Sequence, residues 1–420
     1  MKPSRSWALA AALFTATTTV ALPLSTAHAA DASCLVQRAP ADPEQQRLAD
    51  PRTTELIGQG GLAAFPARFP AALCGVRTAA EADGLVRAWG SALWWAAVDR
   101  AQGHRPGGEL AAGDDRPLYW ARLVMDGQLD RWQPGFAVDA AALRGRFEDA
   151  SRGLTGNGFA GTPGVKRLFV SGFDPFGLDN DIRTANPSGS AVLGLNGRRV
   201  TLDDGETAEI RAVVLPVRYA DFDHGIVERA FGPRMAAGPR AADRITTISQ
   251  GYPGLFTLEA WAGRARSADP YPDNERALSG GTYENPVVAP GMGPGAEFIA
   301  TSLPTGAMTA ATQTPYPVLL HTEVSEIPAG GTETVDRPDG PTPGSRAVAG
   351  GGGGYLSNEV AYRSNRLRLE LRPGLPGGHL HTPVLTGLPA DQAQLTGPDF
   401  ERNESAITSE VLALLTAGWH

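Results

Sequence analysis

The spacing of apolar residues changes at about residue 162, and this change limits the possible fold more than any other feature of the sequence. Beyond it, short apolar runs bounded by turn residues, as in buried strands, occupy residues 168–170, 213–215, 245–248 and 318–320. Helix-like segments lie between and after them, at residues 222–231, 358–369 and 404–415. This alternation predicts an α/β fold, a sheet with helices on both faces. Functional sites in such sheets collect at the carboxyl ends of the strands.

Residues 30–162 are predicted to form a mainly helical N-terminal region, which precedes an α/β domain at residues 163–420. Thr78 and Glu81 have the spacing of a capping box, and an apolar stripe follows at four-residue intervals. A second helix is expected at residues 139–152, ended by Gly153. We interpret the tryptophans of this region as core packing rather than as a ligand platform, since aromatic side chains dominate cores and interfaces: Trp89, Trp94, Trp95, Trp120 and Trp132.

Residues 1–29 have the order of a secretory signal peptide: basic residues, an apolar run, then Ala27-His28-Ala29. We therefore expect a secreted, extracellular protein that has no membrane span after the signal is removed. The two cysteines, Cys34 and Cys74, are expected to form a disulfide in that oxidising compartment. The alternative is a pair of separate buried thiols.

Charge and glycine content exclude two other classes of function. The formal net charge of −8 offers no basic surface to a phosphate backbone, so nucleic acid is not an expected partner. Residues 327–354 are rich in Gly, Pro and Thr, and we expect a long flexible insertion there. Its glycines lack the Lys-Ser/Thr ending of a phosphate-binding loop.

Few residues have the chemistry for catalysis. Ser357 follows the glycine-rich stretch and precedes a predicted helix, where free amides could stabilise an oxyanion. The alternative for this serine is a helix N-cap. His379 and His381 face the same side of an extended segment, a spacing that could bind zinc, but no further ligand pair stands at a recognisable distance. We therefore expect no metal.

Several motifs, in order, give the chain a resemblance to the pyroglutamyl peptidase I family across about residues 165–418. The family's opening Gly-Phe-x-Pro-Phe-Gly is found at 172–177, and its Asn-Pro-Ser at 186–188. Residues 355–358 resemble its nucleophile segment Tyr-Val-Cys-Asn, with Ser357 in place of the cysteine. Further partial matches lie at 215–217, 248–251, 257–262, 272–274, 301–304 and 380–383.

The resemblance implies a pyroglutamyl peptidase-like fold and an omega peptidase that removes N-terminal pyroglutamate. It implies Ser357 as nucleophile, His381 as base and Glu259 as the residue that orients the base. Phe173 and Phe176 would flank the pyroglutamyl ring, with Gln250 nearby. These last three residues are the implied substrate-binding set.

The resemblance also implies which partners and cofactors the protein uses. Peptides with N-terminal pyroglutamate are the expected partners, and the reaction needs no cofactor. A serine nucleophile depends almost wholly on its base, whereas cysteine is already partly ionised. Two alternatives remain open: a pyroglutamyl-peptide binding or structural protein that has lost catalysis, and a serine hydrolase for another acyl group. The oligomeric state is not predicted.

Overall fold

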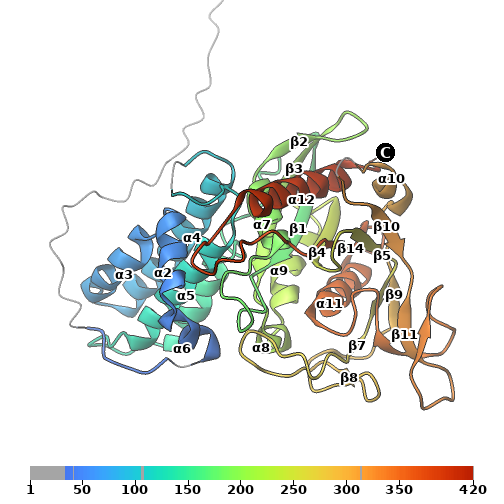
Figure 1. Ribbon diagram of the computed structural model, residues 1–420, viewed down its shortest axis with the longest axis horizontal. Coiled ribbons are helices and arrows are strands. Elements are labelled where there is room, and N and C mark those ends of the chain that lie inside the picture. The colour runs from blue at the N-terminus through green and yellow to red at the C-terminus, as the bar shows by residue number, and fades with distance from the viewer. Residues whose placement is uncertain (1–33, 41, 106–107, 313–314, 420) are drawn as a thin grey trace, which may run out of the picture. The chain divides into compact units, whose positions relative to one another are not determined.

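A seven-stranded mixed sheet organises the second part of the chain (Figure 1). The computed structural model describes residues 34–40, 42–105, 108–312 and 315–419, and the predicted signal peptide lies outside them. The strand order is β10-β5-β14-β4-β1-β3-β2. The strands are β1 (Val165–Phe173), β2 (Arg199–Thr201), β3 (Thr207–Leu215), β4 (Arg244–Gln250), β5 (Phe256–Glu259), β10 (Val318–His321) and β14 (Gly377–Thr382). All four apolar runs lie in these strands, so the prediction of an α/β sheet is confirmed.

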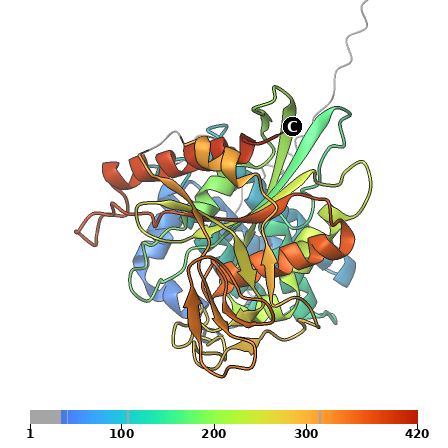
Figure 2. The same cartoon turned by 90° about the vertical axis from the view of Figure 1, so that its right-hand side faces the viewer.

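Helices cover both faces of this sheet, as expected from the sequence. Helices α7 (Pro187–Leu195) and α12 (Pro398–Thr416) lie on one face, while α9 (Ile226–Met235) and α11 (Leu356–Leu371) lie on the other (Figure 2). Side chains alternate across each strand, and β1 shows the result. Its Leu168 packs into the apolar core beside α7, whereas Phe169 contacts Phe231 of α9, with ring centroids 4.9 Å apart.

The described residues before β1 form helices, as the apolar stripe predicts. These helices are α1 (Pro43–Gln46), the short 3₁₀ helix η1 (Arg47–Ala49), α2 (Pro51–Gln59), α3 (Ala64–Gly75), α4 (Ala79–Ala101), α5 (Arg116–Arg131) and α6 (Ala140–Ser151). Thr78 caps α4 by accepting a hydrogen bond from the Glu81 amide, and Asp139 caps α6. Cys34 and Cys74 form the predicted disulfide. Trp94, Trp120 and Trp132 are buried, which supports core packing over a ligand platform.

Buried ion pairs join these helices to the loop that follows β1. Asp174, directly after the last residue of β1, accepts hydrogen bonds from Arg122 of α5, at 2.9 and 3.0 Å, and from Arg152 after α6. All three side chains are at most 3% exposed. The N-terminal helices therefore hold the chain segment that begins with the Gly-Phe-x-Pro-Phe-Gly motif.

The segment expected as a flexible insertion carries regular structure instead. Strands β11 (Val324–Ile327), β12 (Val335–Arg337) and β13 (Arg346–Ala349) form an antiparallel sheet in the order β12-β11-β13. Glu326 explains much of this order, because its buried carboxylate accepts hydrogen bonds from Thr342 and Arg337 across the segment. Such a cross-strand anchor leaves no apolar periodicity in the sequence.

The remaining elements are short. Two-stranded sheets pair β6 (Trp261–Gly263) with β9 (Phe298–Ala300) and β7 (Ala265–Arg266) with β8 (Val287–Val288). The helix expected at 222–231 is divided into α8 (Tyr219–Asp223) and α9, because Gly225 adopts a left-handed conformation with φ of 73°. Helix α10 (Thr305–Ala310) precedes β10. Among the described helices, none combines the length and apolarity that a membrane span requires.

Candidate active site

Polar side chains gather on one face of the sheet at neighbouring strands. On β4, β5 and β14 the apolar residues Ile248, Leu258 and Leu380 face the core beside α7 and α12. Their neighbours in sequence point to the opposite face, where α11 lies, since strand side chains alternate. These neighbours are polar: Thr247, Ser249, Thr257, Glu259, His379 and His381. The pairing of these three strands thus brings together residues that are far apart in the sequence.

Glu259 is the centre of this polar face. Its Oε1 lies 2.7 Å from Nδ1 of His381, and its Oε2 lies 2.7 Å from Nδ1 of His321. Thr257 also donates a hydrogen bond to Oε1. Because Nδ1 of each ring faces a carboxylate, each neutral ring carries its proton there. Nε2 of His381 is then unprotonated, and it has no hydrogen-bond partner among the described residues.

The electrostatics favour an ionised Glu259. Burial opposes its ionisation, but hydrogen bonds from His321 and His381 outweigh burial and lower its pKa below the ordinary value of 4.5. The hydrogen bond to Glu259 raises the pKa of His321 above 6.5, against a smaller opposing effect of burial. A charged carboxylate beside two imidazoles can orient a base and stabilise it once it is protonated.

We expect the titration of His321 to report this ion pair. Its pKa is raised by folding, so the pair stabilises the folded chain fully below about pH 6.5 and less as the pH rises through the raised pKa. Histidine resonances followed by NMR against pH should give His321 a pKa above 6.5, and Glu259→Gln should lower that value. A pKa of His321 at or below 6.5 in the parent chain would contradict the pairing.

Glycine backbone packs directly against both catalytic candidates of this face. A Cβ atom on Gly251 would lie 2.6 Å from Cβ of His381, and one on Gly351 would lie 2.0 Å from Oε2 of Glu259. Neither distance is compatible with a side chain at these positions. The absence of side chains there allows the chain to close around the His381–Glu259 pair.

Ser357 is at the second residue of α11 and is not its N-cap. The N-cap is Tyr355, whose carbonyl accepts hydrogen bonds from the amides of Asn358 and Glu359 at 3.1 and 3.2 Å. The amides of Leu356 and Ser357 have no acceptor in the described parts of the chain. A helix N-terminus with free amides favours a negative charge. The capping role that the sequence left open for Ser357 is therefore not the one observed.

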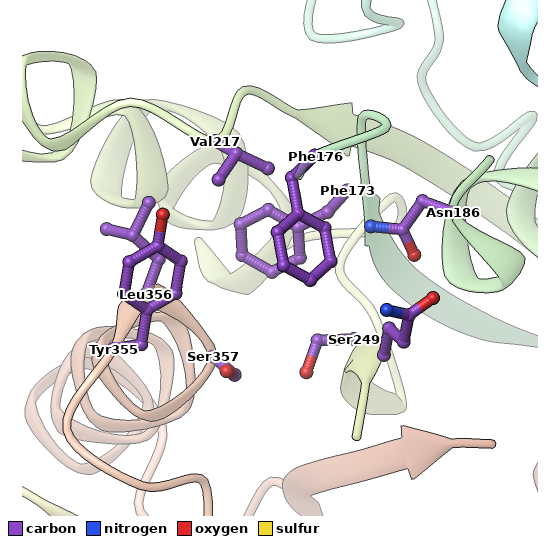
Figure 3. Close-up of a pocket in the computed structure, with 9 residues that line it drawn as sticks. Phe173, Phe176, Asn186, Val217, Ser249, Tyr355, Leu356 and Ser357 are labelled. Atoms are coloured by element: carbon purple, nitrogen blue, oxygen red, sulfur yellow. The ribbon is translucent and has the colours of Figure 1, made fainter. Parts of the chain in front are cut away.

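Ser357 opens onto a small, mainly apolar pocket with a cavity volume of about 30 Å³. Figure 3 shows Ser357 and Ser249 on opposite sides of the pocket, below the rings of Phe173 and Phe176. The nine lining residues are Phe173, Phe176, Asn186, Val217, Ser249, Gln250, Tyr355, Leu356 and Ser357. An apolar cleft with a few polar groups is typical of a small-molecule site. The three residues implied as substrate-binding therefore line the same pocket as the implied nucleophile.

Ser357 and His381, the implied nucleophile and base, are not in hydrogen-bond contact. No hydrogen bond joins Ser357 Oγ to His381 in the described structure, and the Ser357 hydroxyl has no other partner there. By contrast, Ser249 Oγ lies 2.8 Å from Nε2 of His379, whose Nδ1 lies 2.7 Å from Thr247 Oγ1. Both nitrogens of His379 thus bond to hydroxyl groups. In His381, by contrast, Nδ1 bonds to Glu259, and Nε2 has no partner among the described residues.

Three residues of this site were not identified from the sequence: His321, and the pair Ser249–His379. His321 could have been found, because it ends the predicted apolar strand run at 318–320 and so lies at a carboxyl end. Nothing in the sequence pairs Ser249 with His379. That pairing depends on the register of β4 with β14, in which Ser249 lies opposite His381 and Thr247 opposite His379.

Comparison with known proteins identifies matches over most of the chain. Two domain families match in order: the PA0049 N-terminal domain at residues 26–148, and the PA0049 C-terminal domain at residues 167–297 and 302–386. The uncharacterized protein PA0049 of Pseudomonas aeruginosa is 34% identical, over 87% of this chain and 84% of the relative.

Solved peptidase structures are also similar to part of the chain. Pyrrolidone carboxyl peptidase from Thermococcus litoralis is 17% identical, covers 60% of this chain and 94% of its own, and gives a TM-score of 0.38. Pyroglutamyl peptidase I from Bacillus amyloliquefaciens is 20% identical over 59% of this chain and 96% of its own, with a TM-score of 0.35. At these scores the likeness carries no conclusion about activity.

Proposed function

This chain belongs to the PA0049 family, and we propose that it is a hydrolase that removes N-terminal pyroglutamate from peptides by acyl transfer. One observation carries the proposal: a buried Glu259–His381 pair, 2.7 Å apart, in which His381 lies opposite Ser249 on the neighbouring strand, and Ser249 lines the apolar pocket that contains Ser357. A carboxylate, an imidazole and a hydroxyl are the groups that serine-dependent acyl transfer requires. The motifs shared with pyroglutamyl peptidase I add the choice of substrate.

In the proposed reaction, His381 acts first as base and then as acid. Nε2 of His381 takes the Ser357 proton while Nδ1–H donates to Glu259, and Ser357 Oγ attacks the carbonyl carbon of the pyroglutamyl group. Free amides at the start of α11 stabilise the oxyanion. The imidazolium then protonates the leaving amine, and water attacks the acyl-enzyme to release pyroglutamate. Catalytic hydrogen bonds often tighten only when substrate binds, which accounts for the open Ser357–His381 geometry.

The pocket suits an uncharged ring. Phe173 stacks on Phe222 with ring centroids 6.1 Å apart and planes within 5°, which fixes one apolar wall. Gln250 supplies an amide group to the same pocket, whereas the amide of Asn186 is engaged by Asp174 and Ser188. An apolar pocket with few polar groups binds a lactam by its faces and by hydrogen bonds to its edge. We also propose that the protein is exported and that peptides with N-terminal pyroglutamate are its partners.

A pyroglutamyl-coumarin amide tests the proposal directly. Release of coumarin by the parent chain is expected to disappear in Ser357→Ala, because the nucleophile is removed. Ser364→Ala is the matched control: Ser364 is a buried serine of the same helix that bonds only to the Ala361 carbonyl, so activity should be retained. Ser357→Cys should also release coumarin, because a thiol is the stronger nucleophile.

The absence of a hydrogen bond between Ser357 and His381 in the described structure favours a second candidate function. This candidate is a binding protein on the same scaffold without catalysis. Under that candidate the parent chain releases nothing but binds pyroglutamyl peptides in a calorimetric titration. Cleavage by Ser357→Cys alone would identify a pocket that retains its specificity but has lost its nucleophile. If no form cleaves or binds, the pyroglutamyl assignment is wrong.

A further inference from the structure

A line of three hydrogen-bonded side chains ends in the pocket. Ser249, the penultimate residue of β4, lines the pocket and is 4% exposed. Its Oγ lies 2.8 Å from Nε2 of His379, and Nδ1 of the same ring lies 2.7 Å from Thr247 Oγ1. His379 and Thr247 are buried, so water does not compete for these contacts. The reaction proposed above uses none of the three.

The direction of these hydrogen bonds follows from Thr247. The Thr247 hydroxyl donates its proton to the Gly378 carbonyl at 3.3 Å, which leaves its oxygen to accept from Nδ1–H of His379. Burial, and then the neighbouring His381, lower the pKa of His379 well below its ordinary value, so the ring is neutral. Nε2 of His379 is therefore unprotonated, and it accepts the Ser249 proton. Only the oxygen lone pairs of Ser249 remain for a ligand.

We propose that Ser249 is a specificity-determining hydrogen-bond acceptor, which selects a ligand ring that carries an N–H group. The identity of that ring, a pyroglutamyl lactam, rests on the proposed function. A ring oxygen in place of the N–H would direct lone pairs at the lone pairs of Ser249. A site built to accept from an N–H strongly rejects the analogue that lacks it, because the buried acceptor is then unpaired.

Ser249 is not a second nucleophile in this arrangement. A buried, neutral imidazole resists protonation, and the group at its Nδ1 is the uncharged Thr247 hydroxyl rather than a carboxylate. No carboxylate contacts the His379 ring to stabilise the imidazolium that nucleophilic attack by Ser249 would create, and burial outweighs the more distant charge of Glu259.

Two coumarin amides that differ in one ring atom test the inference: pyroglutamyl, a lactam, and 5-oxotetrahydrofuran-2-carboxyl, the corresponding lactone. We expect the parent chain to prefer the lactam in kcat/KM by about 100-fold, and Ser249→Ala to reduce that preference at least tenfold. The ratio of the two activities is the readout, because the lost acceptor bonds only to the lactam. A purely structural role would lower both activities together, and an unchanged ratio in Ser249→Ala would overturn the inference.

Matched variants distinguish an effect of the hydrogen-bond direction in Thr247, His379 and Ser249 from a general loss of structure. Thr247→Val removes the acceptor for Nδ1–H of His379 and should also weaken the preference for the lactam. Thr246→Val and Ser171→Ala are the controls, because both hydroxyls are buried without a hydrogen-bond partner in the described structure. Both should leave the ratio as in the parent. In ¹⁵N spectra of histidine-labelled protein, a proton on Nε2 of His379 rather than on Nδ1 would contradict the proposed direction.

A binding measurement distinguishes this inference from the proposed function. The probes are 2-pyrrolidinone and γ-butyrolactone, titrated into the parent chain and into Ser249→Ala by NMR. Preference of the parent for the pyrrolidinone, lost in Ser249→Ala, supports the inference even if no amide is cleaved. If the parent cleaves the lactam amide and Ser249→Ala keeps the same ratio of lactam to lactone activity, the proposed hydrolase stands and the inference about Ser249 is wrong. If neither fragment binds the pocket, the inference is wrong.

Discussion

Glu259→Gln is expected to lower kcat on the pyroglutamyl amide by about 10³- to 10⁴-fold, the loss typical when the acid of a Ser-His-acid group becomes an amide. The carboxylate accepts from Nδ1 of both His381 and His321. A glutamine has one acceptor oxygen and one donor nitrogen, so one ring must face the NH₂ group. If His381 faces it, its proton moves to Nε2 and the ring cannot accept from Ser357. In either orientation the negative charge that stabilises the imidazolium is lost.

Glu326→Gln is the matched control for this substitution. Glu326 is also a fully buried, hydrogen-bonded glutamate, but it belongs to β11 and contacts Thr342 and Arg337. We expect its amide variant to retain kcat within a few fold while it loses some stability. Steady-state kinetics on both variants, with KM reported separately, make the comparison. A decrease of less than tenfold for Glu259→Gln would remove this residue from the mechanism.

Asp174→Ala is expected to lower the free energy of unfolding by about 3–5 kcal/mol, because it leaves the buried Arg122 without a carboxylate and the buried Arg152 with Glu148 alone. Arg122 and Arg152 are each at most 3% exposed and both bond to Asp174. Urea unfolding of the parent and the variant, with the m-value compared, gives the change in stability. The same variant should reduce activity, since Asp174 follows Phe173 in the motif that lines the pocket.

An exposed aspartate of the following loop provides the control for this effect. Asp179 is 45% exposed and pairs with the exposed Arg276, and its second partner, the buried Arg47, also donates to the Asn274 carbonyl; ion pairs of an exposed carboxylate contribute about 0–1 kcal/mol. Asp179→Ala should therefore change the free energy of unfolding by no more than about 1 kcal/mol. Equal destabilisation by the two alanine variants would show that burial of Asp174 is not the cause.

The sheet could be predicted wherever a strand contains an uninterrupted apolar run. The apolar runs at 168–170, 213–215 and 245–248 lie in β1, β3 and β4, which occupy the middle and one side of the sheet. Strand β5 was not predicted, because polar residues alternate with Phe256 and Leu258 and its run is only four residues long. The β11–β13 sheet was missed for a related reason. A buried Glu326 and its partners order that segment, and such contacts leave no period in the sequence.

The candidate site, like the sheet, could be predicted only in part from the sequence. Ordered motifs indicated Ser357, His381 and Glu259, since each lies in a short segment that can be compared by itself. The structure brings Glu259 within 2.7 Å of His381 and puts Ser357 in the pocket with Phe173, Phe176 and Gln250. The motifs could not indicate that Ser357 Oγ and His381 are not hydrogen-bonded. The position of one side chain relative to another depends on packing between α11 and the sheet.

The sequence by itself determined the fold class, the capped helices before β1, the disulfide and the segments from which the pocket is built, because each depends on local pattern or on residue identity. Only the tertiary structure decided which polar groups share Glu259, and that Ser249, His379 and Thr247 form one hydrogen-bonded line. These groups come from strands that are separated by up to about 130 residues in sequence. Strand order and register set their contacts, and both are properties of long-range pairing.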